Sequence, residues 1–309
     1  MAAQEQESTL TVVVALLANL GIAIAKGIAG GLSGSAAMLS EAAHSLADTT
    51  NQGLLLIAVH RSSRAADEKH PFGYGRERYF WSLLAAVGIF VGGGVFAIMQ
   101  GGRELLDPGG EHGHYTLTYA VLAIAFLLEG TSFAQALRQL RKDARRTGRS
   151  LSDQLWHTTD PATTTVFFED SAALTGLVIA GLGVGLHQAT GHHQWDSIAS
   201  ISIGLLLTVV AFLLGKENRS LIVGEAADPR LQRAISELLS SYDEVTSVDE
   251  LMTMVTGRGE VFVAAHLDLE DTLSAAEVEA LARRMEREVK EREPFVKHFF
   301  VDVTADAKS

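Results

Sequence analysis

The stretch AAMLSEAAHSLADTTNQGLLLIAV, residues 36–59, decides how this chain folds. It is largely apolar and long enough to cross a bilayer as a helix, yet Glu41, His44, Asp48 and Asn51 stand in its middle. Spacings of three and four residues bring side chains onto one helical face, so His44 and Asp48 can offer a nitrogen and a carboxylate oxygen to one point. The stretch therefore predicts a membrane-spanning helix with a polar stripe.

Ionisable side chains in the middle of a membrane need a partner. Each costs roughly 2.5–3.5 kcal/mol on insertion scales, and a divalent cation would compensate a His and two carboxylates well. The alternative is a buried polar network that ties two helices together, but such a network does not need a His with a carboxylate one turn away. We therefore predict a metal site at His44 and Asp48.

Composition limits both the class of protein and the metal ligands. The chain has 309 residues, 47% of them hydrophobic, which is typical of a small polytopic membrane protein with one soluble appendage. It has no Cys, so a transition metal must use His, Asp, Glu, Asn or backbone groups, which admits zinc, manganese, iron or cobalt and disfavours copper(I). No nucleotide loop, nucleophile elbow or zinc-hydrolase motif appears, so we expect neither an enzyme nor an organic cofactor.

Six apolar segments lie near the length of about 20 residues that spanning requires. They predict a six-helix transmembrane domain over residues 1–222, followed by a soluble domain over 223–309. Lys26, near one end of the first segment, either snorkels to the interface, which we favour, or neutralises a buried carboxylate. The segments are about 9–31, 36–59, 79–101, 115–136, 165–187 and 197–215.

The loops predict an orientation. Lys and Arg concentrate in the loops after the second and fourth segments, so the positive-inside rule places these loops and both termini in the cytoplasm. The opposite loops hold His-rich tracts at 111–114 and at His187, His192, His193 and Asp196. Such tracts can bind metal, but we favour exposed loop polarity as their interpretation.

The tail changes character after residue 225. Eighteen acidic residues outnumber ten basic ones there, which argues against a nucleic-acid partner. A helix that begins at Pro229 is followed by strand-like runs at 245–256 and 260–269. A second helix, with a capping-box signal at Ser274 and Glu277, comes before a last strand-like run at 295–304. This α-β-β-α-β order predicts a small α+β domain with an open-faced sheet and helices on one side.

Further acids lie in the fourth and fifth segments. Glu169 and Asp170 point about 100° apart on a helix, so only one is expected to share the cavity of His44, and we predict Asp170. Glu169 is then a second ligand, a proton carrier or the partner of a basic group. Glu129 is either satisfied by packing or used in transport, and with Glu41 it is a candidate for proton coupling or for support behind the ligands.

Together these motifs resemble the cation diffusion facilitators, six-span metal transporters with a cytoplasmic ferredoxin-like domain. The most specific piece is SEAAHSLADTTNQ at 40–52, because the family's second span carries a His or Asp followed four residues later by Asp. HPFGYGRERYFW at 70–81, FFEDSAALTG at 167–176 and the α-β-β-α-β tail support the likeness. The sequences of these motifs are most similar to the branch of the family that contains zinc transporter 9.

The resemblance implies zinc efflux by proton antiport, with Zn²⁺ as the substrate and a homodimer in the lipid bilayer. Members with a well-defined zinc site have a His four residues before the fifth-span Asp, but alignment on Asp170 places Val166 there. Glu169, Asn51 or water is then expected to supply the fourth ligand, and this harder oxygen set favours Mn²⁺ or Fe²⁺ more than usual. The alternatives are a manganese or iron exporter that uses the same site, with Co²⁺ also admitted, or a membrane metal sensor without transport.

Two accessory metal sites of the family are incomplete in this chain. His70 matches one ligand of a site after the second span, but Tyr74 stands where another His would be. In the tail, His266 and Asp302 stand near regulatory metal positions, while Phe300 occupies a place often held by His. We therefore expect weak accessory ligands and a tail that dimerises without a complete binuclear centre.

The beginning of the chain, MAAQEQES, has no Arg and two Glu, unlike a mitochondrial presequence, and lacks the basic region of a cleaved signal peptide. We therefore expect a bacterial plasma membrane, with both termini in the cytoplasm.

Overall fold

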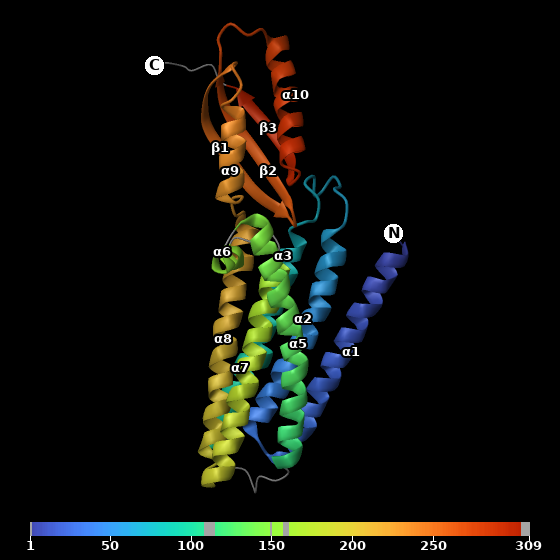
Figure 1. Ribbon diagram of the computed structural model, residues 1–309, viewed down its shortest axis with the longest axis vertical. Coiled ribbons are helices and arrows are strands. Elements are labelled where there is room, and N and C mark those ends of the chain that lie inside the picture. The colour runs from blue at the N-terminus through green and yellow to red at the C-terminus, as the bar shows by residue number, and fades with distance from the viewer. Residues whose placement is uncertain (1, 108–114, 149, 157–160, 304–309) are drawn as a thin grey trace. The chain divides into compact units, whose positions relative to one another are not determined.

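The chain forms two compact units. The computed structural model describes residues 2–107, 115–148, 150–156 and 161–303. One unit comprises Met1–Val59 and Phe80–Asn218, and the other comprises His60–Tyr79 and Arg219–Ser309. The first is a bundle of long helices, and the second contains a small sheet with two helices (Figure 1).

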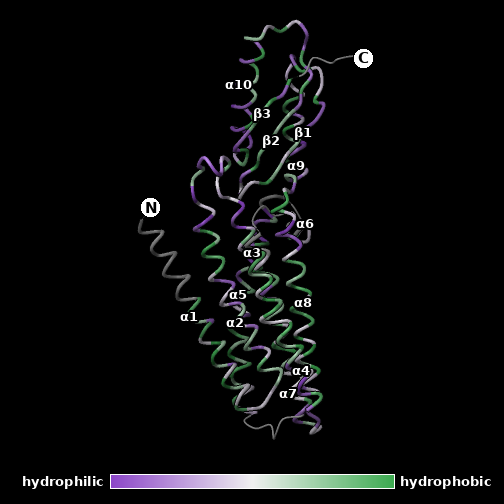
Figure 2. The backbone as a smooth tube through the Cα atoms, turned by 180° about the vertical axis from the view of Figure 1, so that it is seen from behind, coloured by the Kyte–Doolittle hydropathy of each residue, from purple (hydrophilic) through white to green (hydrophobic). Residues whose placement is uncertain are grey.

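Among the residues that the structure describes, five helical stretches are long and apolar enough to cross a membrane, and they match five of the six predicted spans. Hydrophobic positions run along these stretches (Figure 2). The stretches are Leu16–Ser33, Glu77–Leu106, Tyr115–Arg145, Thr165–Thr190 and Gln194–Val223. The helices of this part of the chain are α1 (Ala2–Ser33), α2 (Ala36–Ser62), α3 (Glu77–Gly88), η1 (Ile89–Val95), α4 (Phe96–Leu106), α5 (Tyr115–Thr147), α6 (Leu151–Trp156), α7 (Pro161–Thr190) and α8 (Gln194–Val223).

Helix α2 is less apolar than these five stretches because it carries the polar stripe. Eleven of its residues are buried, among them Glu41, His44 and Asn51. Its polar side chains reach three neighbouring helices: Glu41 contacts α1, Ser40 contacts Ser200 of α8 at 2.7 Å, and Asn51 contacts α7. The groups that would be costly against lipid therefore face other helices.

The predicted third span contains a π-helical segment that the sequence did not reveal. It is the run from α3 through η1 to α4, and η1 includes the glycines at 92–94. A Cβ on Gly93 would lie 2.9 Å from Cδ1 of Leu207, and one on Gly94 would lie 2.8 Å from Oγ1 of Thr208. Both neighbours belong to α8, so the glycines let the backbone of η1 approach that helix closely.

The C-terminal elements follow the predicted α-β-β-α-β order. Strand β2 pairs antiparallel with β1 and parallel with β3, which gives the sheet order β1-β2-β3. Alternate residues of β2 from Val261 to Leu269 are buried and pack with Ile235, Leu239 and Met285 of the helices. Both helices thus cover one face of the sheet. The elements are α9 (Pro229–Leu239), β1 (Val245–Gly257), β2 (Glu260–Leu269), α10 (Ala275–Arg292) and β3 (Val296–Val303).

The capping box predicted for α10 is confirmed. The Ser274 side chain accepts a hydrogen bond from the Glu277 backbone N–H, and the Glu277 side chain accepts one from the Ser274 backbone N–H at 2.8 Å. These two bonds satisfy backbone donors that the first helical turn leaves without partners. The bond to the Ser274 N–H also holds the pKa of Glu277 below its ordinary value.

The segment between α2 and α3 packs within the second unit. The Phe72 ring makes edge contacts with Phe262 and His298, with ring centroids 5.6 and 5.3 Å apart, on the sheet face that the helices leave open. The Arg76 guanidinium donates to the sulfur of Met254 at 2.6 Å. Two residues of the motif HPFGYGRERYFW, Phe72 and Arg76, therefore pack against the C-terminal sheet.

Candidate metal site in the helical bundle

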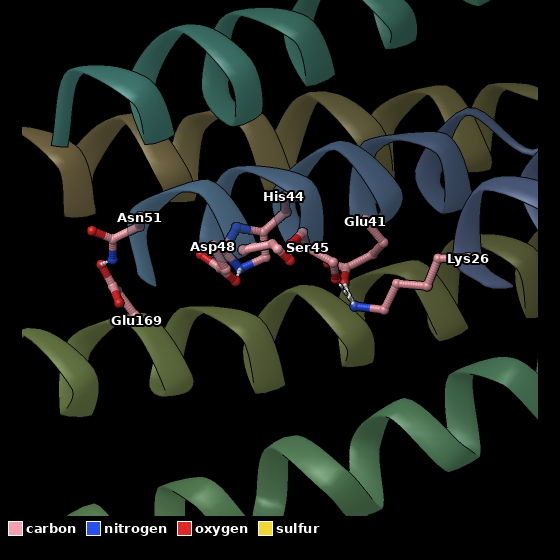
Figure 3. Close-up of polar contacts among 8 residues, drawn as sticks. Lys26, Glu41, His44, Ser45, Asp48, Asn51 and Glu169 are labelled. Atoms are coloured by element: carbon pink, nitrogen blue, oxygen red, sulfur yellow. Dashed lines mark hydrogen bonds and ion pairs between the residues drawn. The ribbon is translucent and has the colours of Figure 1, made fainter. Parts of the chain in front are cut away.

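A row of polar side chains lies along α2 on the side that faces α7. Figure 3 shows Lys26 of α1 at one end of the row and the pair of Asn51 and Glu169 at the other, with Glu41, Ser45, His44 and Asp48 between them. The spacing of three and four residues along α2 produces this row, as the sequence predicted.

Lys26 forms an ion pair inside the bundle. Its Nζ donates to Oε2 of Glu41 at 2.9 Å and to Oγ of Ser45 at 2.7 Å. The side chains of Lys26 and Glu41 are both 0% exposed. The favoured expectation that Lys26 snorkels to the interface is therefore wrong, because its position on α1 directs the ammonium toward a carboxylate of α2 rather than toward the helix end.

His44 and Asp48 meet one turn apart, with 3.4 Å between Nε2 of the imidazole and Oδ2 of the carboxylate. Their side chains are 2% and 14% exposed. Two ligands that are each about 2.0–2.1 Å from a tetrahedral zinc ion lie about 3.3 Å from each other. The observed spacing suits two ligands of one metal ion.

Several atoms of this row are buried and lack hydrogen bonds. They are both ring nitrogens of His44 and one side-chain oxygen each of Glu41, Asp48 and Asn51. Buried polar atoms are nearly always paired, because an unpaired one costs about 1–3 kcal/mol. This concentration on one helix makes the row the candidate binding site.

The two adjacent acids of α7 have hydrogen-bond partners on different helices. Nδ2 of Asn51 donates to Glu169, whereas Asp170 accepts a hydrogen bond at 2.8 Å from Ser132 of α5. Glu129 is partly buried on α5. Within the described residues, no three His, Asp or Glu side chains lie close enough together to hold a metal ion.

The accessory candidates form pairs rather than larger clusters. Nδ1 of His70 lies 3.4 Å from Oδ1 of Asp67, and the imidazole stacks on Tyr74 at 4.2 Å between ring centroids. The Tyr74 hydroxyl donates to Asp67 at 2.6 Å, which holds the pKa of that carboxyl below its ordinary value. In the tail, Nδ1 of His266 lies 3.4 Å from Oδ2 of Asp302, its neighbour across β2 and β3.

Asp196 has a role that the sequence did not reveal. It is buried, and it accepts hydrogen bonds from Oγ of Ser35 at 2.7 Å and from the backbone N–H of Ala37 at 3.2 Å, so it caps the first turn of α2. His187 is also buried, near Tyr115. The interpretation of these polar residues as exposed loop residues is therefore wrong for Asp196 and His187. His192 is exposed, as expected. Residues 111–114 lie outside the described residues.

The bundle and its buried stripe define an α-helical membrane protein with ionisable groups in its interior, a feature of proteins that move ions. Residues 12–223 match the cation efflux transmembrane domain, and residues 227–304 match the cation efflux protein cytoplasmic domain. The chain therefore belongs to the cation efflux family, and the predicted resemblance is confirmed. This family consists of transporters rather than enzymes.

Similar proteins include eukaryotic and bacterial transporters. The human protein named proton-coupled zinc antiporter SLC30A9, mitochondrial, is 34% identical over 238 residues, which are 77% of this chain and 42% of the relative. Metal tolerance protein C4 of Arabidopsis thaliana is 34% identical over 85% of this chain and 58% of its own length. The cation-efflux pump FieF of Citrobacter koseri is 22% identical over 85% of this chain. The chain thus spans less than two thirds of the length of the two relatives at 34% identity.

These relatives correct the expected location. The bacterial plasma membrane was inferred from the acidic first residues, but the relatives at 34% identity include a human protein named as mitochondrial and a plant protein. The expectation is therefore wrong, because the charge of a few terminal residues says little about which membrane holds the spans.

Proposed function

We propose that this protein carries a divalent metal ion, Zn²⁺ in the first place, across a membrane in exchange for protons, and that His44 and Asp48 bind the ion. The observation that carries the proposal is the group of five buried side-chain atoms on α2 that lack hydrogen bonds, between Glu41 and Asn51. A metal ion at His44 and Asp48 would give partners to atoms whose burial is otherwise costly. The metal-binding atoms would then be shielded from water and free of competing hydrogen bonds before the ion arrives.

The spacing of the two groups supports zinc. The 3.4 Å between Nε2 of His44 and Oδ2 of Asp48 matches two corners of a zinc tetrahedron. Asn51 supplies an oxygen atom from the next turn of α2, and Glu169 supplies oxygen atoms from α7. We propose that a rearrangement of α7 brings Glu169 or Asp170 to the ion and completes the site.

Proton exchange follows from the chemistry of the ligands. A metal ion needs a neutral His and ionised carboxylates, so its binding releases protons and protonation from the other side ejects it. The name of the human relative, a proton-coupled zinc antiporter, supports the same cycle for this chain. Glu41 and Glu129 are the further acids we propose for proton coupling or for support of the ligands.

One observation favours a second candidate, a manganese or iron exporter. His44 is the only nitrogen ligand candidate of this row, while Asp48, Glu169 and Asn51 offer oxygens. Oxygen-rich sites suit harder ions such as Mn²⁺. The same residues would then carry Mn²⁺ or Fe²⁺.

Flux measurements in proteoliposomes with an imposed pH gradient test the proposal. Zinc, manganese, iron and cobalt are offered to the native chain and to Asp48→Asn, a variant of nearly equal size. We expect gradient-driven zinc flux that the variant loses. Stronger manganese or iron flux would select the second candidate, and metal binding without flux of any ion would select a sensor and overturn the transport proposal.

We also propose that the protein is a homodimer and that its tail has a ferredoxin-like fold. Each chain would have six spans, because α2 would cross the membrane in addition to the five apolar stretches described above. The sheet face opposite α9 and α10 exposes apolar side chains, with Met252 at 52% and Phe300 at 54%. A second copy would cover such a face. Light scattering of the purified protein in detergent measures the mass of the complex, and a monomeric mass at micromolar concentration would contradict the dimer.

A further inference from the structure

The ion pair of Lys26 and Glu41 lies at one end of the stripe, and metal binding by His44 and Asp48 does not use it. Glu41 is one turn from His44 on α2, and Ser45, the other partner of Lys26, is the next residue after His44. Three and four residues apart on a helix are neighbouring positions, so the Glu41 carboxylate is within reach of an ion bound at His44.

The Glu41 carboxylate is held from two sides. Lys26 of α1 contacts Oε2, while Oε1 is buried without a hydrogen bond. On α7, a Cβ placed at Gly176 would overlap Oε1. The absence of a side chain at Gly176 therefore leaves the room that this carboxylate occupies.

We propose that Lys26 is a tethered cation that keeps Glu41 out of the coordination of the metal and thereby sets which metals the site at His44 and Asp48 accepts. This inference rests on the proposed function of that site. The ammonium neutralises Glu41 at 2.9 Å and also donates to Oγ of Ser45 at 2.7 Å. A metal ion that enters the site then meets one fewer oxygen ligand.

The consequence concerns selectivity. Without Lys26, the buried Glu41 carboxylate would need another cation, and a metal ion at His44 is the nearest candidate. An added carboxylate makes the ligand set harder, which favours Mn²⁺ over Zn²⁺. Lys26 therefore acts as a residue that determines specificity without binding the metal itself.

A purely structural role makes a different prediction. If the ion pair only held α1 against α2, removal of either partner would loosen the bundle, and both single variants would change metal binding in the same direction. A tethered cation instead predicts opposite changes: loss of Lys26 exposes a carboxylate to the metal, and loss of the Glu41 charge exposes an ammonium.

The experiment measures equilibrium binding of Mn²⁺ and Zn²⁺ to the full chain purified in detergent. Lys26→Met is expected to tighten Mn²⁺ binding about tenfold and Zn²⁺ binding less, whereas Glu41→Gln weakens the binding of both ions about tenfold. The double variant Lys26→Met/Glu41→Gln should return to within about threefold of the native dissociation constants. Lys216→Met, which removes an exposed ammonium on α8, is the matched control and should bind as the native chain does.

The outcomes separate this inference from the function on which it rests. If the native chain binds no metal, the proposed function fails. If it binds metal and the two single variants shift the affinity in the same direction or not at all, only the role of Lys26 is overturned. Should Lys26→Met fail to fold, the double variant must still bind both ions about tenfold more tightly than Glu41→Gln, and equal affinities would overturn the inference.

Discussion

The stripe on α2 and the C-terminal sheet treat buried polar atoms in opposite ways. Between Glu41 and Asn51, five buried side-chain atoms lack a hydrogen bond, whereas in the described residues from 219 to 303 no buried side-chain nitrogen or oxygen does. In the sheet, alternate residues of β2 are apolar and packed against α9 and α10. The sheet leaves no such atom without a partner in this range, whereas α2 carries the cost in stability of buried polar atoms without hydrogen bonds.

The largest expected effect is on transport, at the centre of the stripe. His44→Leu removes two nitrogen atoms without hydrogen bonds and keeps an apolar side chain in their place. We expect metal flux to fall by at least about 100-fold, because the only imidazole of the row is gone. The unfolding temperature should stay the same or rise, because a buried polar group is replaced by an apolar one.

Flux in proteoliposomes and thermal unfolding in detergent are measured on the same preparation. An unfolding temperature that fell together with the flux would contradict the contrast between α2 and the sheet, because His44 would then stabilise the fold.

The second effect is on the stability of the sheet. Leu267 on β2 is 0% exposed. Leu267→Ala should lower the free energy of unfolding of the C-terminal unit by about 2–5 kcal/mol, as expected for a buried Leu. Hydrogen exchange of peptides from β2 in the full chain measures this change.

Met252→Ala is the control, because Met252 on the neighbouring strand is 52% exposed. It should change the same free energy by less than about 0.5 kcal/mol. Equal effects of the two variants would show that the sheet is not packed as described.

A smaller effect is expected where α7 passes Glu41. Gly176→Ala places a methyl group on the Glu41 carboxylate and should destabilise the bundle by about 1–3 kcal/mol through overpacking. Gly181→Ala on the same helix is the matched control, because its new methyl group would meet only Cδ1 of Leu122, at 4.0 Å. Thermal unfolding should separate the two variants, and a shift of the same size and sign in both would contradict the close approach.

The smallest effect concerns the capping box of α10. Ser274→Ala should cost about 1 kcal/mol of stability in the C-terminal unit, as is typical for the loss of an N-cap. Hydrogen exchange in the first turn of α10 measures it. No change there would show that the box does not stabilise the helix.

The pH dependence of the same box has a definite sign. The pKa of Glu277 is lower in the folded chain than its ordinary value, because the Ser274 N–H donates to the carboxylate. Its contribution is therefore present above the ordinary pKa and is lost as the pH falls toward the lowered one. The stability difference between the native chain and Glu277→Gln should shrink on acidification below about pH 4.5, and a difference that grew would contradict this account.

The sequence predicted what depends on local patterns. A strand-like run at 260–269 located β2, the Ser274 and Glu277 spacing located the start of α10, and the three- and four-residue spacing located the stripe of α2. Each of these signals lies within one element. Such signals can be read without knowing which elements are neighbours.

Contacts between distant elements could not be predicted. Whether Glu169 or Asp170 reaches α2 depends on the rotation of α7, and the structure pairs Asn51 with Glu169. The bond from Ser35 to Asp196 joins residues 161 positions apart. The pairing of Lys26 with Glu41 depends on how α1 packs against α2, so the sequence could only offer it as an alternative.

The second unit is built from two segments that are far apart in the sequence, and this limits the order in which its contacts can form during synthesis. Phe72 lies in the segment between α2 and α3, but the side chains it packs against, Phe262 and His298, come near the end of the chain. A chain made from its N-terminus therefore cannot make both contacts of Phe72 until residue 298 has been synthesised. Ribosome stalling between β2 and β3 would leave Phe72 able to contact Phe262 but not His298. The segment after α2 would then stay incompletely packed, a state that chaperones and proteases can recognise.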